Sequence, residues 1–279
     1  MRKIVTIVGL GVVGGSFAMA LKGKDYDVYG IDTDENALAQ AKEGGYIIEG
    51  FTEGKEILLK SDITFICLYP SAILEYLRTH KFKKGSIVSD CVGIKSYFLK
   101  DALEIIDDDI EYISGHPMAG RESRGFAFAS AEVFIGANYI IVQHEKNDPE
   151  KIKFLQDFVG DLGFKSVKIL SPYDHDEIIS FTSQLPHVIA ISLINSDTQK
   201  FDTGKYIGDS YRDLTRIADV NEDLWTELFL NNKQALLQSI YNFEEQFDIM
   251  KKAIEESDYE TLRNRFEEGG KRKRHLLHD

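Results

Sequence analysis

The sequence predicts an α/β protein in which a doubly wound parallel sheet is followed by an all-helical domain. In the first part of the chain, short apolar strands alternate with helical segments, as a doubly wound sheet requires. After about residue 170 the short strands stop, and long helical stretches continue to the C-terminus. We therefore place a domain boundary near Ser171 and expect domains over residues 1–170 and 171–279.

The first element of the chain predicts a dinucleotide site. An apolar strand over residues 4–8 leads directly into Gly9-x-Gly11-x-x-Gly14. In a Rossmann-type fold the first glycine permits a tight turn, the second lets the backbone approach a pyrophosphate, and the third lets the next helix pack closely on the strand. A helix over about residues 13–22 would direct its free N–H groups at the phosphates.

A second strand, over residues 27–31, ends in Asp32 at the position where the fold places an acid against the adenosine ribose. A carboxylate there would repel a 2′-phosphate, and no arginine follows it, so the predicted cofactor is NAD. The predicted NAD-binding residues are Gly9, Leu10, Gly11, Val12, Val13, Gly14, Asp32, Tyr69 and Pro70. The alternatives are a tight turn without a ligand and a signal peptide, which the glycine-rich and polar composition after Gly9 disfavours.

The remaining elements follow from the apolar pattern. Helices are expected over residues 35–44, 95–106 and 149–162, and strands over 63–68, 86–90, 111–115, 138–142 and 166–169. In the second domain, residues 174–199 are apolar on most faces, which predicts a helix surrounded by protein. Between Leu236 and Ile254, apolar residues recur every three or four positions and predict a seam for a partner helix, from the same domain or from a second subunit.

The composition excludes several classes of function. A net charge of −13 and an isoelectric point near 5.1 argue against a nucleic-acid partner. No apolar run approaches the twenty or so residues of a membrane span, and we expect a cytoplasmic protein. Cys67 and Cys91 have neither CxxC nor metal-ligand spacing, so we expect reduced structural thiols and no metal site.

His116 is the first candidate for chemistry. It lies in the glycine-rich stretch 114–120, after a predicted strand and at the edge where such sheets present their active cleft. A histidine there could take a proton from a substrate hydroxyl while a hydride leaves the same carbon. The residue alone fits an ordinary loop hydrogen-bonding role equally well.

Together with the amino-terminal glycine loop, three further motifs carry a family resemblance. They are Gly115-His-Pro-Met-Ala-Gly120, Ser183-Gln-Leu-Pro-His187, and Tyr211-Arg-Asp-Leu-Thr-Arg-Ile-Ala218 followed by Trp225. In these motifs, which span most of the chain, the sequence resembles the prephenate/arogenate dehydrogenases of tyrosine biosynthesis. The resemblance implies a nucleotide-binding domain, an all-helical dimerisation domain and a homodimer.

The resemblance also implies a reaction and its residues. The reaction is NAD-dependent oxidative decarboxylation of prephenate to 4-hydroxyphenylpyruvate, or the equivalent reaction of arogenate. By the family pattern His116 is the proton acceptor, Arg216 binds a substrate carboxylate, and Ser183 and His187 are further substrate contacts. A planar guanidinium suits a carboxylate better than an ammonium does.

Two positions depart from the family pattern. Gly93 stands where the family has a serine that hydrogen-bonds the catalytic region, and we expect a water, Ser89, Ser96 or a cofactor group to take its place. Gln184 replaces a common histidine, which leaves the choice between prephenate and arogenate open.

Other interpretations remain open. A different β-hydroxyacid or imine-type dehydrogenase would use Lys95 as its acid or base, and a redox sensor would bind NAD without turnover. Several residues also have simpler structural interpretations or only a possible role. Arg212 and Arg216 could form surface ion pairs, His187 could be a core histidine, Trp225 could be packing, His175 could cap a helix, and Glu122 and Asp213 could lie near the mouth of the cleft.

Overall fold

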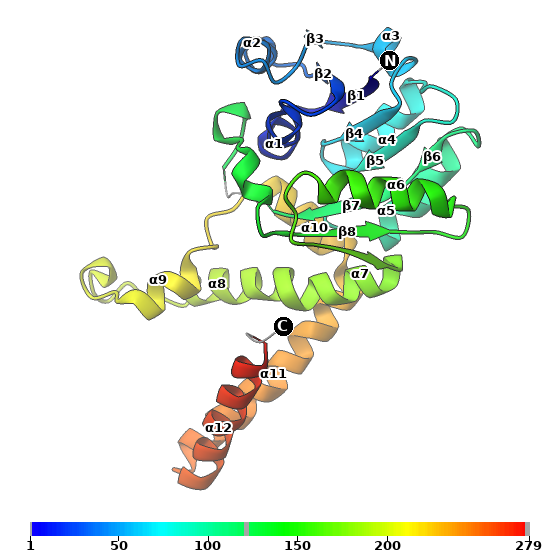
Figure 1. Cartoon of the computed structure of the whole chain (residues 1–279). Coiled ribbons are helices and arrows are strands. Elements are labelled where there is room, and N and C mark those ends of the chain that lie inside the picture. Colours follow the sequence, from blue (N-terminus) through cyan, green and yellow to red (C-terminus); the bar gives the residue numbers. More distant parts are fainter. Residues whose placement is uncertain (1, 120–122, 277–279) are drawn as a thin grey trace. The chain divides into compact units, whose positions relative to one another are not determined.

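The computed structural model describes residues 2–119 and 123–276 (Figure 1). The chain divides into two compact units, Met1–Asn232 and Lys233–Asp279. The helices between residue 171 and Asn232 thus belong to the first unit, so compactness divides the chain later than the domain boundary expected near Ser171. That boundary stays a prediction.

A parallel six-stranded sheet forms the centre of the first unit. Its strand order is β3-β2-β1-β4-β5-β6, and every neighbouring pair is parallel. The strands are β1 Lys3–Val8, β2 Tyr26–Ile31, β3 Glu49–Phe51, β4 Ile63–Ile66, β5 Ile87–Asp90 and β6 Glu111–Tyr112. The chain reverses its winding direction between β1 and β4, and in such sheets a ligand crevice opens at that point, outside the carboxyl ends of the strands. The predicted Rossmann-type sheet is confirmed.

Helices cover both faces of this sheet, and an apolar core lies between the helices and the sheet on each face. They are α1 Val12–Leu21, α2 Glu35–Glu43, α3 Lys55–Leu58, α4 Pro70–Thr79 and α5 Ser96–Ile105. One core contains Phe17 of α1 stacked on Phe65 of β4, with ring centroids 4.7 Å apart. The other contains Ile73 of α4 and Phe98 of α5. The continuous apolar run of β4 is explained by this burial on both faces.

A second, three-stranded sheet corrects the sequence prediction. Strand β7 (Ser114–Met118) pairs antiparallel with β8 (Asn138–Val142), which pairs parallel with β9 (Ser166–Leu170). The expected single strand over 111–115 is therefore wrong, because it divides into β6 and β7 in different sheets. His116 lies within β7, opposite Ile140, and not in a loop. An apolar pattern identifies a strand but does not specify its partner, which long-range packing selects.

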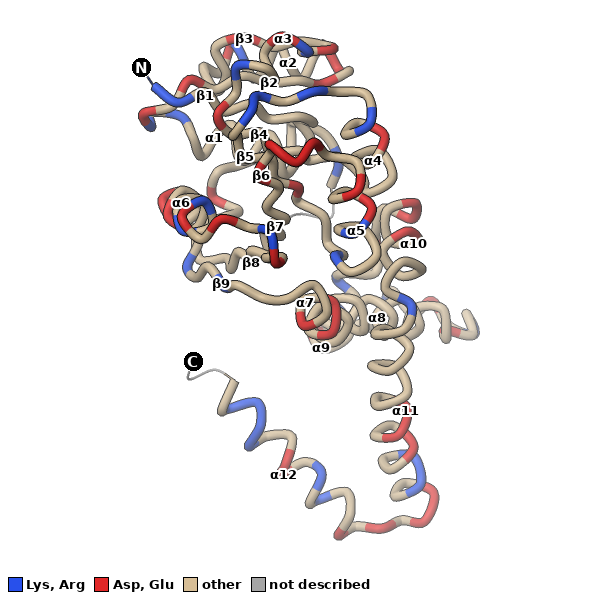
Figure 2. Tube along the Cα trace, turned by 90° about the vertical axis from the view of Figure 1, so that its right-hand side faces the viewer, with Lys and Arg blue, Asp and Glu red and all other residues tan. Residues whose placement is uncertain are grey.

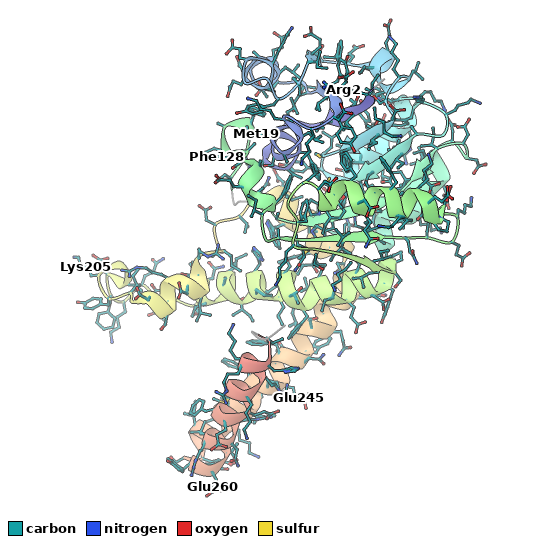
Figure 3. All side chains as sticks on the ribbon, in the orientation of Figure 1. Arg2, Met19, Phe128, Lys205, Glu245 and Glu260 are labelled. Atoms are coloured by element: carbon teal, nitrogen blue, oxygen red, sulfur yellow. The ribbon has the colours of Figure 1, made fainter. Side chains whose placement is uncertain are left out.

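The elements around the second sheet complete its packing. Helix α6 (Pro149–Gly160) connects β8 to β9, and Asp148 caps it by accepting a hydrogen bond from the amide of Glu150 at 2.8 Å. The 3-10 helices η1 (Phe126–Phe128) and η2 (Ala131–Phe134) lie alongside α1, as the labels at Met19 and Phe128 in Figure 3 indicate.

After Ser171 the first unit is helical. A continuous run consists of α7 (Pro172–Ile179), the π-helical turn η3 (Ser180–Gln184) and α8 (Leu185–Asn195). Pro186 has no N–H to donate within this run, and a local π-helical turn is one way in which a helix accommodates such a break. The shorter helices η4 (Thr203–Lys205), α9 (Asp209–Thr215) and α10 (Glu222–Asn231) follow.

The long helical run is less covered than its composition predicts. Ile178, Phe181 and Ile194 are 44%, 62% and 41% exposed, so the expectation that protein surrounds this helix is wrong for a single chain. By length and composition alone, Pro172–Asn195 is apolar enough to cross a membrane, with 28% of its most apolar window buried. Counting consecutive apolar residues missed this run because polar residues interrupt it.

The second unit is a helical hairpin of α11 (Lys233–Glu255) and α12 (Tyr259–His275). Ser257 turns the chain with a φ of +53°, and the carboxylate of Asp258 then caps α12. Two residues of the predicted seam, Phe247 and Ile254, are 60% and 63% exposed. The basic cluster 271–274 lies in the final turns of α12 (Figure 2).

Candidate active site

The glycine loop has the geometry that a dinucleotide site requires. Gly9 adopts a φ of +84°, and a Cβ there would lie 2.6 Å from the carbonyl oxygen of Cys67. A Cβ on Gly14 would lie 1.8 Å from the Gly9 oxygen, so only glycine allows α1 to pack this closely on β1. The Cβ position of Gly11 faces open space, which leaves the backbone accessible to a pyrophosphate at the amino end of α1.

Asp32 is bound to the same loop. Its carboxylate accepts hydrogen bonds from the amides of Leu10 at 2.5 Å and Asp34 at 2.8 Å, and its own amide donates to the oxygen of Phe51 at 3.1 Å. Beside it lies a surface hollow lined by Glu35, Leu38 and residues 50–54. The loop, the carboxylate and this hollow all lie at the carboxyl ends of β1 to β3, where a doubly wound sheet binds a dinucleotide.

Replacing Asp32 tests its role in cofactor choice. We expect wild-type kcat/KM to be higher with NAD than with NADP. Asp32→Ser should reduce the ratio of kcat/KM with NAD to kcat/KM with NADP by about tenfold or more, because the repulsion of a 2′-phosphate is lost. Asp34→Ser is the matched control, since Asp34 caps α2 at the same surface. A wild-type preference for NADP would remove Asp32 from this role.

At the carboxyl ends of β4 and β5, free thiols and a buried ion pair lie next to the glycine loop. The sulfurs of Cys67 and Cys91 are 3.6 Å apart, and both cysteines are free thiols. Asp90 and Lys95 are fully buried and their charged atoms are 2.7 Å apart. The ammonium of Lys95 is the partner of a buried carboxylate, a structural role that accounts for this residue without the acid or base function of the rival dehydrogenase class.

This ion pair fixes the strand that carries the candidate base. The ammonium of Lys95 also donates to the carbonyl oxygen of Gly115 at 2.6 Å, one residue before His116. The other oxygen of Asp90 accepts hydrogen bonds from the hydroxyls of Tyr112 at 2.9 Å and Ser114 at 2.6 Å. A buried ion pair is tolerated when its remaining polar atoms are satisfied, and these contacts satisfy them while holding the backbone at Gly115.

His116 is half-buried at this edge and contacts a second histidine. Its Nδ1 lies 2.8 Å from Nε2 of His175, and Nδ1 of His175 lies 2.8 Å from a carboxylate oxygen of Asp176. Burial, followed by the proximity of His175 and Lys95, holds the pKa of His116 well below its ordinary value. His116 is therefore unprotonated at neutral pH and able to accept a proton.

The other predicted substrate residues lie on the helices after Ser171. Ser183 is in the π-helical turn, and its carbonyl oxygen lies 2.8 Å from Nδ1 of His187. The ring of His187 packs on Trp225 of α10 with centroids 3.6 Å apart. Arg216 ends α9, which packs against the helix of His187, and its side chain is exposed.

Helix α10 joins these residues to the cleft. Leu228 of α10 reaches Gly93, where a Cβ would lie 3.5 Å from its side chain and 3.7 Å from Nε2 of His116. The side-chain Nε2 of Gln184 donates to the carbonyl oxygen of Leu228 at 3.1 Å. Near the end of β4, Asn221 at the start of α10 donates to the hydroxyl of Tyr69 at 2.6 Å. The nucleotide sheet and the helices thus meet around Nε2 of His116.

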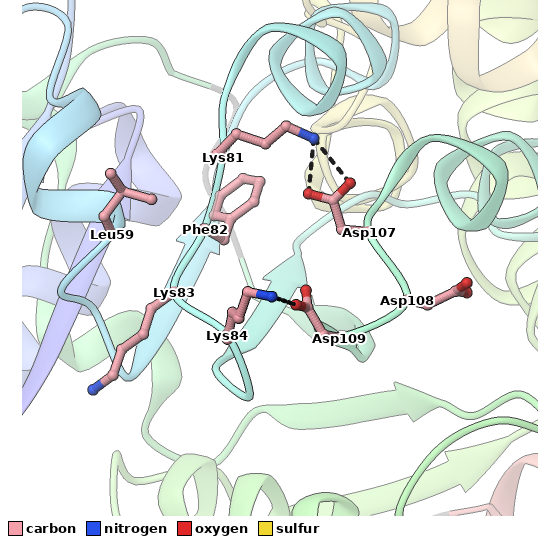
Figure 4. A pocket seen from close by; sticks show the side chains of 8 residues that line it. All are labelled: Leu59, Lys81, Phe82, Lys83, Lys84, Asp107, Asp108 and Asp109. Atoms are coloured by element: carbon pink, nitrogen blue, oxygen red, sulfur yellow. Dashed lines mark hydrogen bonds and ion pairs between the residues drawn. The ribbon is translucent and has the colours of Figure 1, made fainter.

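A second hollow lies at the amino ends of the strands of the central sheet (Figure 4), whereas the glycine loop follows the carboxyl end of β1. It is lined by Leu59, Lys81, Phe82, Lys83, Lys84, Asp107, Asp108 and Asp109, before the amino ends of β5 and β6. Lys81 pairs with Asp107 at 2.7 Å, and Lys84 with Asp109 at 2.9 Å. Charges that neutralise one another in this way leave little for an ionic ligand.

Comparison with known proteins identifies the family. Residues 17–168 match the model of the prephenate dehydrogenase nucleotide-binding domain, and residues 171–268 match that of the prephenate dehydrogenase dimerization domain. The chain belongs to the prephenate dehydrogenase family.

Three relatives illustrate the similarity. A prephenate dehydrogenase of Lactococcus lactis is 29% identical over 97% of this chain and 76% of its own. A cyclohexadienyl dehydrogenase of Zymomonas mobilis is 27% identical over 96% of this chain and 94% of its own. The structure of a prephenate dehydrogenase from A. aeolicus, in complex with hydroxyphenyl propionate and NAD+, has 27% identity and a TM-score of 0.89 over 99% of each chain.

Sequence reasoning missed part of the site. His175 is not a helix cap: it is fully buried between His116 and Asp176, and Ser171 caps the helix instead. The available signal was a His-Asp pair at the start of an otherwise apolar helix, since such polar residues are rarely buried without partners. Asp213 is exposed, and Glu122 and Gly120 lie outside the described residues.

The family serine is not replaced by a neighbouring serine. Ser89 donates its hydroxyl to the carbonyl oxygen of Asp90, and Ser96 interacts with Asp176. Instead, His175 contacts Nδ1 of His116, whereas Nε2 of His116 faces Gly93.

Gly93→Ser tests how this position contributes. Gly93 is outside the positive-φ region, and the distances to its Cβ position are those of ordinary van der Waals contact, so we expect the variant to fold normally. We expect kcat to change by no more than about tenfold, equivalent to roughly 1.4 kcal/mol, because a hydroxyl can add only one hydrogen bond near His116. Thermal melting and steady-state kinetics check this. A large loss of stability would contradict the unstrained geometry.

Proposed function

We propose that this NAD-dependent dehydrogenase catalyses the oxidative decarboxylation of prephenate to 4-hydroxyphenylpyruvate, a step of tyrosine biosynthesis. The observation that carries the proposal is the position of His116: its ring lies beside Gly93, which follows the carboxyl end of β5, and Leu228 of α10 reaches the same glycine. A base at this position suits a substrate whose hydroxyl-bearing carbon loses hydride.

The chemistry explains which groups the protein must supply. NAD, when bound at the glycine loop, accepts the hydride from the carbinol carbon. The bond to the ring carboxylate breaks as the hydride leaves; its electron pair completes the aromatic ring, and CO2 departs. His116 accepts the hydrogen bond of the hydroxyl and takes up its proton as the carbon loses hydride, and the imidazolium then returns the proton to the oxygen of the phenol product. Aromatisation drives the reaction forward.

Two substrate carboxylates need cations in an acidic protein. Arg216 is the proposed partner of one of them, and Ser183 and His187 are the proposed contacts for other polar atoms of the substrate. The stacking of His187 on Trp225 restricts its ring. Preorganised side chains of this kind lower the entropic cost of orienting the substrate.

An absorbance assay at the reduced-nicotinamide band tests the proposal. Prephenate and arogenate are supplied separately with NAD, and the product is identified by mass. Turnover of prephenate supports the proposal, and turnover of arogenate alone would assign the other substrate. Silence with both, together with NAD binding, would favour a sensor or another dehydrogenase.

We also propose a homodimer formed through the helical segments. The helices of the dimerization-domain match carry exposed apolar side chains, among them Phe181, Ile194, Phe247 and Phe266. Exposed apolar side chains gathered on the same helices favour burial against a second chain. We expect light scattering to give about 63 kDa, twice the 31.6 kDa of the chain. A mass of one chain at micromolar concentration would contradict the prediction.

A further inference from the structure

Two side chains, Asp176 and His175, link the amino end of α5 to the proposed base. The carboxylate of Asp176 accepts hydrogen bonds from the amides of Lys95 at 2.8 Å and Ser96 at 2.7 Å. It also contacts Nδ1 of His175 at 2.8 Å, and Nε2 of His175 contacts Nδ1 of His116 at 2.8 Å. Asp176 and His175 are 5% and 0% exposed, so solvent supplies no alternative partner for these atoms.

The carboxylate determines the protonation of its neighbour. Burial alone would raise the pKa of Asp176, but the hydrogen bonds from His175 and Ser96 outweigh it and lower the pKa below its ordinary value. An ionised carboxylate only accepts hydrogen bonds, so Nδ1 of His175 must carry a proton. Burial also lowers the pKa of His175, which keeps that ring neutral and leaves a lone pair on its Nε2.

The lone pair of His175 in turn determines the tautomer of His116. Two nitrogen lone pairs cannot face each other at 2.8 Å without repulsion, so Nδ1 of His116 must be the donor. His116 is neutral, and its remaining lone pair is therefore on Nε2. That atom lies on the side of Gly93, 3.7 Å from the position of a Cβ there.

We propose that His175, held by Asp176, is a positioning residue that keeps His116 in the Nδ1–H tautomer and so presents the Nε2 lone pair to the substrate hydroxyl. This inference rests on the proposed function, in which His116 accepts that hydrogen bond. It also explains how the chain works with Gly93 in place of the family serine, since the ring is oriented through its opposite nitrogen. Lys95 fixes the backbone at Gly115, and His175 fixes the ring.

Two substitutions at position 175 separate the two hydrogen bonds of this residue. The end of a glutamine side chain reaches about as far as Nε2 of histidine, so His175→Gln can still accept from His116. Asparagine reaches only about as far as Nδ1, so His175→Asn can contact Asp176 but not His116. We expect His175→Asn to lower kcat by about ten- to a hundredfold, because it removes the hydrogen bond that keeps the proton of His116 on Nδ1. His175→Gln retains that hydrogen bond, and its kcat should stay within about fivefold of wild type.

The Michaelis constant and the cofactor affinity distinguish positioning from a loss of structure. In the part of the chain that the structure describes, the ring of His175 makes its hydrogen bonds with His116 and Asp176. KM for prephenate and the Kd for NAD should therefore change by less than about threefold in both variants. Melting temperatures identify any variant that fails to fold. Equal losses of kcat in the two variants, or an unchanged kcat in His175→Asn, would overturn the proposal.

Nitrogen NMR of the 15N-histidine-labelled full-length protein reads the tautomer directly and needs no substrate. In the wild type, His116, assigned by the loss of its signals in His116→Asn, should show a protonated Nδ1 and an unprotonated Nε2. In His175→Asn, signal should shift toward the Nε2–H tautomer. A wild-type His116 with its proton on Nε2 would disprove the inference even if every variant of His175 failed to fold.

The same measurement separates this inference from the proposed function. If the enzyme turns over neither prephenate nor arogenate while His116 shows the predicted tautomer, the proposed function fails and the positioning by His175 stands. If prephenate is turned over while His116 shows the other tautomer, the function stands and the positioning fails.

Discussion

His116→Asn is expected to lower kcat by about two to four orders of magnitude, the usual range for the loss of a general base, with a smaller change in KM. Asparagine preserves polarity on β7 but cannot take up a proton at neutral pH. Steady-state kinetics with prephenate and NAD measure the effect. His275→Asn is the matched control, because His275 is exposed near the end of α12 and should leave both constants unchanged. A kcat within tenfold of wild type would exclude His116 as the base.

The pH profile gives a second test of the same residue. Only unprotonated His116 can act, and burial holds its pKa well below the ordinary value of histidine. As the pH falls, kcat/KM should therefore stay high through the usual histidine range near 6.5 and decline only at lower pH. The acid limb should disappear in His116→Asn. An acid limb with its midpoint above 6.5 would contradict the assigned environment.

Arg216→Ala is expected to act mainly on substrate binding. Loss of a charged hydrogen bond to a carboxylate costs about 1.5 to 3 kcal/mol, so KM for prephenate should rise roughly ten- to a hundredfold while kcat changes less. Removing the partner of a buried, desolvated carboxylate would cost more free energy than this. That larger cost does not apply to the isolated chain, because Arg216 is exposed there. It would apply if substrate or a second subunit covers the side chain.

Arg212→Ala is the matched control for this prediction. Arg212 lies one helical turn earlier, is also exposed and pairs with Asp209 at 3.1 Å. It should leave KM within about twofold, since exposed ion pairs contribute little. Equal effects of both substitutions on KM would indicate general electrostatic attraction of a dianion. A loss of kcat without a change in KM would assign Arg216 to the transition state instead.

Local signals were sufficient for the nucleotide-binding half of the site. The backbone itself requires Gly9, through a positive φ, and Gly14, through a close helix contact, while Gly11 leaves the approach to the loop open. Asp32 follows its strand directly. The chemistry of this half therefore depends on residues that are close together in the chain. The sequence alone predicted a Rossmann-type sheet and the glycine loop, and the resemblance in the motif around His116 identified the proposed base.

Contacts between distant segments decided the rest. The sequence cannot show that β7 leaves the central sheet to pair with β8, because an apolar strand does not specify its partner. Nor can it show that His175, 59 residues after His116, buries its ring against the base. Burial removes solvent as a hydrogen-bonding partner, so the direction of each remaining hydrogen bond is forced by its neighbour. The motif thus identified His116 as the candidate base, and only the contacts in the tertiary structure indicate which of its ring nitrogens carries the lone pair available to the substrate.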